Sequence, residues 1–326
     1  MKNLFFRLSV SAVCALGALA TAPALAQAPA FPNKPIHLII PAAAGGPTDS
    51  IGRLLGKTMT ELYGMPVVVE NRAGAAGSIG VNAVVLAPAD GYTLLVSTPD
   101  AVTVYPQAKR NAPYKTTDLT PLTLVASTPY VFAVNAQSPA KTMKEFVALS
   151  KTQKLAMATA GAGSSGHIVL EMLKQRAGIE LLHVPYRGSG PALQSIIAGE
   201  TQITATSPVT LKGHIDSGRL RALAVSKSAR NPVMPNVPTM IESGFPNFDV
   251  AAWFGVFGPP SLPPAIAEKL NEMVLSAMKS PDYVSRMGAL GLDIEPLSRG
   301  KFGDMLALET ERWRQLIESA KITMDE

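Results

Sequence analysis

Two glycine-rich loops contain the residue types best suited to binding or catalysis. Residues 42–49 (AAAGGPTD) and 161–167 (GAGSSGH) each follow an apolar run typical of a buried strand and precede a helical pattern. Glycines let the backbone approach a ligand closely, and the free N–H groups at a helix start favour an anion. Each loop therefore predicts an anion cradle. For the first loop, simple helix capping by Thr48 or Asp49 explains the pattern equally well.

The second loop also matches the dinucleotide pattern GxGxxG. No acidic residue ends the next strand, although Arg187 could accept a 2′-phosphate. Residues 1–26 have the layout of an export signal, as argued below, and a chain exported unfolded would meet little nicotinamide cofactor. We therefore expect no cofactor, and interpret the loop as an anion site with two hydroxyl donors.

Ser164, Ser165 and His167 raise a hydrolase hypothesis, because a nucleophilic serine needs a nearby base. The GxSxG pattern is absent around both serines, and His167 at a helix start is more typical of a hydrogen-bonding residue. The four histidines are widely spaced and HExxH is absent, so we expect no metal site.

Other candidate residues follow later strands. Tyr186 could face a cleft and Arg187 could pair with a carboxylate, but structural roles explain both equally well. For the pair Trp253-Phe254 we favour a place in the core over a cleft wall.

Strands alternating with helices must position these loops. This pattern predicts parallel sheets covered on both faces, with ligands beyond the carboxyl ends of the strands. The predicted strands are 36–40, 67–70, 92–97, 130–134, 155–159, 181–184, 201–205 and 221–225. Helical spacing is clearest in the segments 51–62, which Gly64 ends, 168–177, 192–197, 264–278 and 302–317.

Residues 1–26 have the layout of a secretory signal: Lys2 and Arg7, an apolar stretch, and Ala24-Leu25-Ala26 before Gln27. Its removal would lower the formal charge from +5 to +3 and remove Cys14, the single cysteine. We expect an exported, disulfide-free periplasmic protein. The 47% hydrophobic residues exclude global disorder, and the dispersed basic residues argue against a nucleic-acid partner.

Several short motifs run in order over nearly the whole chain after residue 26. They are the segments 41–49 (PAAAGGPTD), 67–74 (VVVENRAG) with 77–80 (GSIG), 89–95 (ADGYTLL), 163–167 (GSSGH), 183–188 (HVPYRG), 220–225 (LRALAV) and 235–239 (PNVPT). In this order and spacing they resemble the Bug-type extracytoplasmic solute-binding proteins of tripartite tricarboxylate transporters.

The resemblance implies an α/β fold: a two-lobed periplasmic-binding-protein fold of type II, each lobe a mainly parallel sheet flanked by helices. We expect lobe 1 to comprise 27–125 and 226–326, and lobe 2 to comprise 126–225. Family members commonly hold a carboxylate with amides, hydroxyls and water from the loops that correspond to Ala43–Asp49 and Ala162–His167. The predicted ligand-binding residues are Ala43, Ala44, Gly45, Gly46, Thr48, Asp49, Ser97, Ala162, Gly163, Ser164, Ser165, His167, Tyr186 and Thr206.

This sequence also departs from the family pattern. Members often have Asp where Ser195 stands, and an aromatic-Asp pair near Ala205-Thr206. The smaller residues predict a roomier or more neutral pocket in that lobe.

These features predict a non-enzymatic, monomeric receptor that binds a small carboxylate-bearing organic acid and docks onto membrane transporter subunits. An exported α/β hydrolase using the same cleft is one alternative. A ligand-sensing partner of a membrane signalling protein is another.

Overall fold

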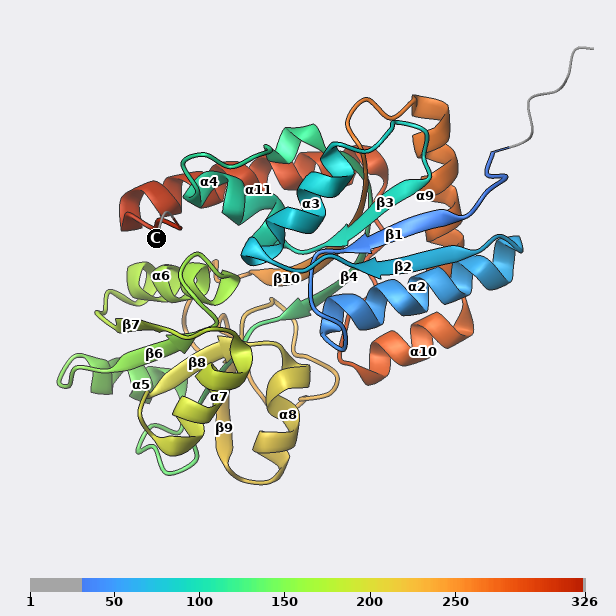
Figure 1. Ribbon diagram of the computed structural model, residues 1–326. Coiled ribbons are helices and arrows are strands. Elements are labelled where there is room, and N and C mark those ends of the chain that lie inside the picture. Colours follow the sequence, from blue (N-terminus) through green and yellow to red (C-terminus); the bar gives the residue numbers. More distant parts are fainter. Residues whose placement is uncertain (1–30, 325–326) are drawn as a thin grey trace, which may run out of the picture. The chain divides into compact units, whose positions relative to one another are not determined.

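Two five-stranded sheets flanked by helices form the body of the molecule (Figure 1). The computed structural model describes residues 31–324, so the predicted signal segment 1–26 lies outside the described residues. Both sheets belong to one compact unit that begins at Lys34. Within residues 31–324, no helix combines the length and the apolar character that crossing a bilayer requires.

The first sheet has the strand order β2-β1-β3-β10-β4. Its pairing is parallel except at β10, which runs antiparallel to both β3 and β4. Leu38 in the central β1 pairs with Val69 on one side and Leu94 on the other. The strands are β1 (Ile36–Ile40), β2 (Val67–Asn71), β3 (Thr93–Ser97), β4 (Thr120–Pro129) and β10 (Ala251–Gly258).

The second sheet repeats this topology with the order β7-β6-β8-β5-β9. Here β5 alone runs against its neighbours. The strands are β5 (Val131–Asn135), β6 (Ala156–Thr159), β7 (Leu182–Pro185), β8 (Ile203–Thr206) and β9 (Leu220–Val225). Both sheets are thus mainly parallel with one reversed strand, and the predicted fold class is confirmed.

The chain passes between the sheets twice. It enters the second sheet at Tyr130, between β4 and β5, and returns through residues 226–250 before β10. Because these two passages connect the sheets, any movement of one sheet against the other must turn about them.

The helices cover the faces of the two sheets. On the first sheet lie α2 (Pro47–Tyr63), α3 (Ser78–Val85), α9 (Pro264–Met278) and α10 (Pro281–Ala289), with the short segments η1 (Ala75–Gly77), η2 (Asp100–Val104), α4 (Tyr105–Ala108) and η3 (Thr116–Asp118). The second sheet carries α5 (Met143–Ser150), α6 (Ser165–Ala177), α7 (Ser189–Ala198) and α8 (Pro208–Asp216). The last helix, α11 (Arg299–Ala320), packs on β4 of the first sheet and on α6 of the second.

The helix α2 shows how the sequence sets these boundaries. Pro47 takes the first helical position, where its missing N–H costs nothing, so the helix begins one residue before Thr48. Gly64 ends it in the left-handed conformation, with φ at 68°. Between these ends, Ile51, Leu55 and Met59 bury one face against the sheet.

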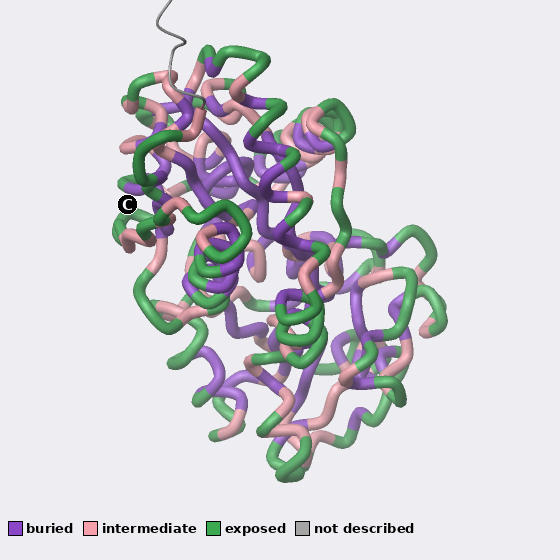
Figure 2. The backbone as a smooth tube through the Cα atoms, turned by 90° about the vertical axis from the view of Figure 1, so that its right-hand side faces the viewer, coloured by how far each residue is buried: buried purple, intermediate pink, exposed green. Residues whose placement is uncertain are grey.

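Apolar side chains between sheets and helices form the cores. The buried residues are the purple segments of the backbone in Figure 2. Trp253, Phe257 and Phe302 pack together on the first sheet. Phe132 and Phe248 pack edge to face on the second sheet. Trp253 is 3% exposed and lies in the core, as predicted. Phe254 is also buried, at 5% exposed, but it lines the cavity described below, so the preference for the core over a cleft wall is wrong for this residue.

Candidate ligand-binding site

A cavity of about 370 Å³ opens at the carboxyl ends of the parallel strands of both sheets. Its wall combines the loops after β1, β3, β6 and β8 with the passage from β4 to β5. The lining residues include Gly45, Pro47, Thr48, Ser50, Thr98, Asp100, Thr128, Tyr130, Thr159, Ser164, Ser165, Gly166, Ser189, Ala205, Thr206, Ser207, Phe254, Leu290 and Leu292. This position agrees with the general rule for ligands of open α/β sheets.

Four helices begin at the cavity. Their ends are marked by Pro47 of α2, Ser165 of α6, Ser189 of α7 and Ser207 before α8. Each helix start carries roughly half a positive charge, and each favours a nearby anion by about 0.3–1 kcal/mol. The first turns and their hydroxyls therefore provide an anion-attracting wall without any basic side chain.

Asp49 fastens the first loop and does not line the cavity. Its Oδ2 accepts hydrogen bonds from the Gly45 amide and from Arg53 Nε, both at 2.9 Å, and its Oδ1 accepts one from Asn71. Burial acts to raise the pKa of this carboxyl, but the hydrogen bonds outweigh burial and lower the pKa to about 2. Asp49 thereby holds Gly45 in the cavity wall.

Of the remaining predicted residues in the first lobe, some line the cavity and others do not. Gly45 and Thr48 line the cavity, whereas Ala43 and Ala44 are exposed outside its wall. Gly46 is the N-cap of α2, between two lining residues. Ser97 lies fully buried at the end of β3, so its side chain is shut off from the cavity.

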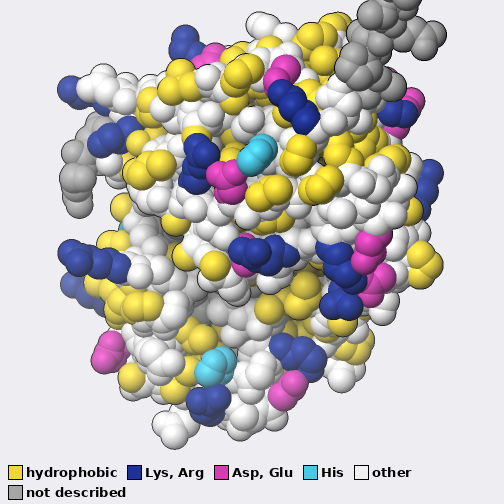
Figure 3. Space-filling view, turned by 45° about the vertical axis from the view of Figure 1, so that its right-hand side comes forward, with side chains coloured by type: hydrophobic (Ala, Val, Ile, Leu, Met, Phe, Trp, Pro, Cys, Tyr) yellow, Lys and Arg dark blue, Asp and Glu magenta, His cyan; other side chains and the backbone are white. Residues whose placement is uncertain are grey.

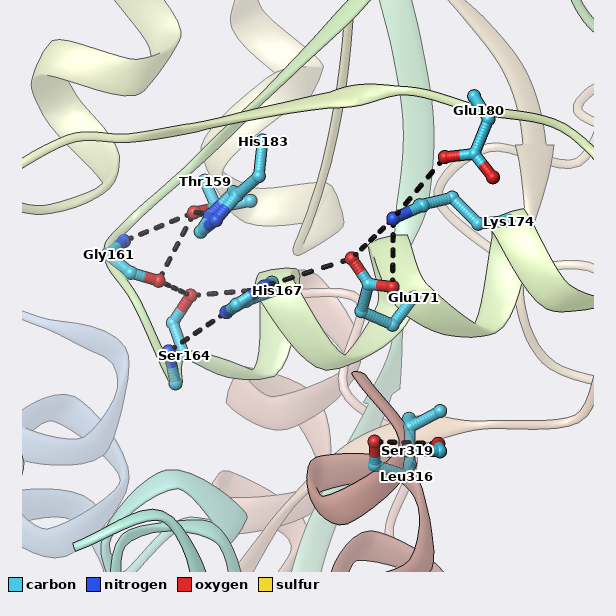
Figure 4. Close-up of polar contacts among 11 residues, drawn as sticks. Thr159, Gly161, Ser164, His167, Glu171, Lys174, Glu180, His183, Leu316 and Ser319 are labelled. Carbon is cyan, nitrogen blue, oxygen red and sulfur yellow. Dashed lines mark hydrogen bonds and ion pairs between the residues drawn. The ribbon is translucent and has the colours of Figure 1, made fainter. Parts of the chain in front are cut away.

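In the second loop, Ser164 caps α6 (Figure 4). Its Oγ accepts a hydrogen bond from the His167 amide and donates one to the Gly161 carbonyl at 2.8 Å. The His167 ring turns elsewhere, because its Nδ1 accepts a hydrogen bond from the Gly163 amide at 3.1 Å. Ser164 and His167 thus make no nucleophile–base contact in this structure, whereas Ser164 and Ser165 both line the cavity.

Two stacked histidines support this loop from behind. The rings of His167 and His183 lie 3.7 Å apart at 18°, and His183 Nε2 contacts Thr159 Oγ1 at 2.7 Å. Burial lowers the pKa of each ring to about 4, with a further contribution from Lys174 for His167 and from His167 for His183. Because both pKa values lie well below 7, the pair is uncharged at neutral pH and supports the loop. Figure 4 shows His167 beside Glu171, which also pairs with Lys174.

Of the other predicted residues in the second lobe, three lie off the cavity and Thr206 lines it. Ala162 is exposed, Gly163 is buried behind the loop, and Tyr186 packs on the apolar cluster around Val131. Thr206 lines the wall next to Ala205. Ser195 is buried away from the wall because its hydroxyl bonds to the Ala192 carbonyl and to Thr201. Of the three family departures, Ala205 and Thr206 therefore border the cavity and Ser195 does not.

The sequence prediction missed Thr98, Asp100, Thr128 and Tyr130 in the wall. Of the described residues, Asp100 is the only carboxylate there, and no Lys, Arg or His lines the cavity. Asp100 Oδ1 accepts a hydrogen bond from the Ser165 amide at 3.1 Å. Burial raises the pKa of Asp100 to about 6, although the Ser165 amide opposes this shift. The sequence did offer one indication of this role, because Asp100 comes three residues after the predicted strand 92–97.

Charge elsewhere on the molecule is mixed. In the view of Figure 3, Lys and Arg side chains lie dispersed among Asp and Glu and form no single basic patch on that face. Within residues 31–324, no group of three His, Cys, Asp or Glu side chains is placed to hold a metal ion.

Known proteins match this chain over most of its length. The sequence pattern of the tripartite tricarboxylate transporter family receptor matches residues 51–322. The chain belongs to this receptor family. Protein BugT of Bordetella pertussis is 35% identical to this receptor, over 88% of the chain and 89% of its own length.

Two solved structures share its fold. The periplasmic binding protein BugD is 29% identical, with a TM-score of 0.77, over 90% of this receptor and 99% of the BugD chain. The R. palustris protein Rpa4515, solved with adipate, is also 29% identical, with a TM-score of 0.80 over 90% and 99% of the two chains.

Proposed function

We propose that this receptor binds a small carboxylate-bearing organic acid in the periplasm and delivers it to membrane subunits of a tripartite tricarboxylate transporter. The observation that carries the proposal is the convergence of helix starts from both sheets on one cavity; those of α2, α7 and α8 are free of any side-chain carboxylate in the wall. Family membership and the adipate bound to Rpa4515 support the same chemistry.

The cavity wall suits a carboxylate held by neutral donors. Backbone N–H groups at the helix starts and the hydroxyls of Thr48, Ser165 and Thr206 supply those donors. Water can bridge the remaining distances at little cost in affinity, so such a site tolerates ligands of different shapes. The ligand's charge is then met by helix ends and not by an arginine clamp.

Closure follows from the two passages between the sheets. The proposed lobes are residues 27–125 with 226–326, and residues 126–225. Gly45 and Thr48 come from the first lobe, and Ser164 and Thr206 from the second, so each supplies part of the wall. Approach of the lobes around the ligand would complete the donor set and exclude bulk water.

The proposal is tested with Thr206→Val, which removes one hydroxyl from the cavity wall while keeping the shape of the side chain. Loss of one hydrogen bond should weaken binding by about 3- to 10-fold. A thermal-shift screen of mono- and dicarboxylates first identifies ligands, and calorimetry then compares the two proteins. The matched control Thr117→Val, at an exposed position, should bind like the unmodified protein.

Two results would contradict this proposal. One is the absence of any stabilising carboxylate in the screen. The other is turnover of a bound ester or amide, which would favour an enzyme. Transport is tested by ligand uptake in cells that lack the receptor: restoration by the unmodified chain is expected, with weaker restoration by Thr206→Val at low ligand concentration.

A further inference from the structure

The cavity contains a carboxylate of the protein itself, which a site for organic acids does not need. Asp100 begins η2, directly after the loop that follows β3 of the first sheet, and its side chain reaches the start of α6 on the second sheet. There its Oδ1 accepts the Ser165 amide hydrogen bond at 3.1 Å. The protein's own carboxylate therefore occupies one of the four helix starts that could attract an anion.

This carboxylate has no cationic partner in the wall. No Lys, Arg or His lines the cavity among the residues described, and the other ionisable group there is the phenol of Tyr130. Burial raises the pKa of Tyr130, so that group stays neutral. Asp100 is half-buried, and a carboxylate partly withdrawn from water without a cation is costly, so a ligand cation beside it would offset part of that cost.

The remaining helix starts keep their attraction for an anion. Those of α2, α7 and α8 lie around the same cavity, lined by Thr48, Ser189 and Ser207. One region of the cavity thus favours a negative group, while the region at Asp100 favours a positive one. A dicarboxylate would have to place its second charge in the field of Asp100.

We propose that Asp100 makes this receptor select zwitterions, small acids that carry a cationic amino group besides a carboxylate, over dicarboxylates of the same length. This inference rests on the proposed receptor function and names its substrate class. The ammonium group would donate to the Asp100 carboxylate, and the ligand carboxylate would lie against the free helix starts. Above pH 7, the Asp100 carboxyl, with its pKa of about 6, is mostly ionised.

Matched ligand pairs test the selection. Each pair has the same methylene chain and one carboxylate, and differs only in a terminal ammonium or second carboxylate. Suitable pairs are 3-aminopropanoate with succinate, 4-aminobutyrate with glutarate, and 5-aminopentanoate with adipate. Calorimetry at about pH 7.5 should show tighter binding of the amino acid in at least one pair.

Asp100→Asn should then lower the preference for the amino acid by about tenfold or more, because it keeps an acceptor for the Ser165 amide but removes the charge. Asp100→Ser, which also lacks the charge, gives a second test if the first variant unfolds. The matched control Asp304→Asn, at an exposed position on α11, should leave the preference unchanged.

The outcomes separate the two proposals. One outcome is that dicarboxylates bind the unmodified receptor as tightly as their amino partners, and that Asp100→Asn leaves the ratio of the two dissociation constants unchanged. This outcome would overturn the selection and leave the receptor function intact. If no member of any pair binds the unmodified protein but another carboxylate of the screen does, the selection is overturned and the receptor function stands. If no carboxylate of the screen binds, both proposals fail.

Discussion

Single residues in this receptor divide into those that face the cavity and those that hold the cavity's loops. Asp49 and His167 belong to the second group, although both occur in loops predicted to bind the ligand. Asp49 bonds to the Gly45 amide, and His167 bonds to the Gly163 amide. Both side chains thereby hold backbone in the conformation that presents lining residues. In such loops, polar residue types alone do not distinguish a ligand contact from a support.

The supporting histidines predict a pH dependence of stability. In the folded protein the pKa of His167 and of His183 is lowered to about 4, whereas an unfolded histidine titrates near 6.5. Between these values the unfolded chain binds more protons, so stability is lost as the pH falls from about 6.5 towards 4. Protonation of one ring accounts for a loss of up to about 3 kcal/mol in the free energy of unfolding across this pH range, and for less in the case of the partly exposed His183.

The variant His183→Gln tests this prediction because it removes one titrating ring and keeps a polar partner for Thr159. Urea unfolding between about pH 4 and pH 7 should show a pH dependence reduced by less than about half, because His167 retains the larger share. The control His37→Gln, at an exposed position, should keep most of the dependence. An unchanged slope in His183→Gln would refute the assignment of this loss to the stacked pair.

At the scale of elements, α11 packs on β4 of the first sheet and on α6 of the second, and it carries a half-buried acid, Glu309. Glu309 Oε2 accepts a hydrogen bond from Trp253 Nε1 at 2.8 Å and a longer one from Thr103. Burial raises the pKa of this carboxyl to about 7, against the opposing effect of these hydrogen bonds. The folded protein therefore holds this proton more tightly than the unfolded chain, and Glu309 costs stability as the pH rises from about 4.5 through 7.

Glu309→Gln should remove this cost while keeping an oxygen acceptor for Trp253. We expect the variant to be more stable than the unmodified protein by about 1–2 kcal/mol at pH 8, with the difference vanishing near pH 4.5. Denaturant unfolding at both pH values measures it. Glu272→Gln, at an exposed position on α9, is the matched control and should change little. A variant that is destabilised equally at both pH values would contradict the pKa assignment.

At the scale of the whole molecule, local patterns predicted all five strands of the second sheet and β1, β2 and β3 of the first, but not β4 and β10 of the first sheet. The runs 36–40 and 92–97 are apolar and bounded by breakers, so they read as strands. Strand β4 has Pro121 near its start and Pro129 at its end, and its neighbour β10 comes more than 120 residues later. That pairing has no local signal. The same holds for Asp100 and Tyr130, which reach the cavity only once both sheets are in place.

The last prediction concerns where the mature chain begins. Signal cleavage needs small residues at the positions occupied by Ala24 and Ala26, so the exported protein should start at Gln27. Because Cys14 would leave with the signal, the mature receptor should contain no titratable thiol. Mass spectrometry of an osmotic-shock fraction and a thiol assay measure both properties. Ala26→Leu should block cleavage, whereas Ala28→Leu, just beyond the site, should not. A full-length chain retained in the cytoplasm would contradict export and the periplasmic site of action.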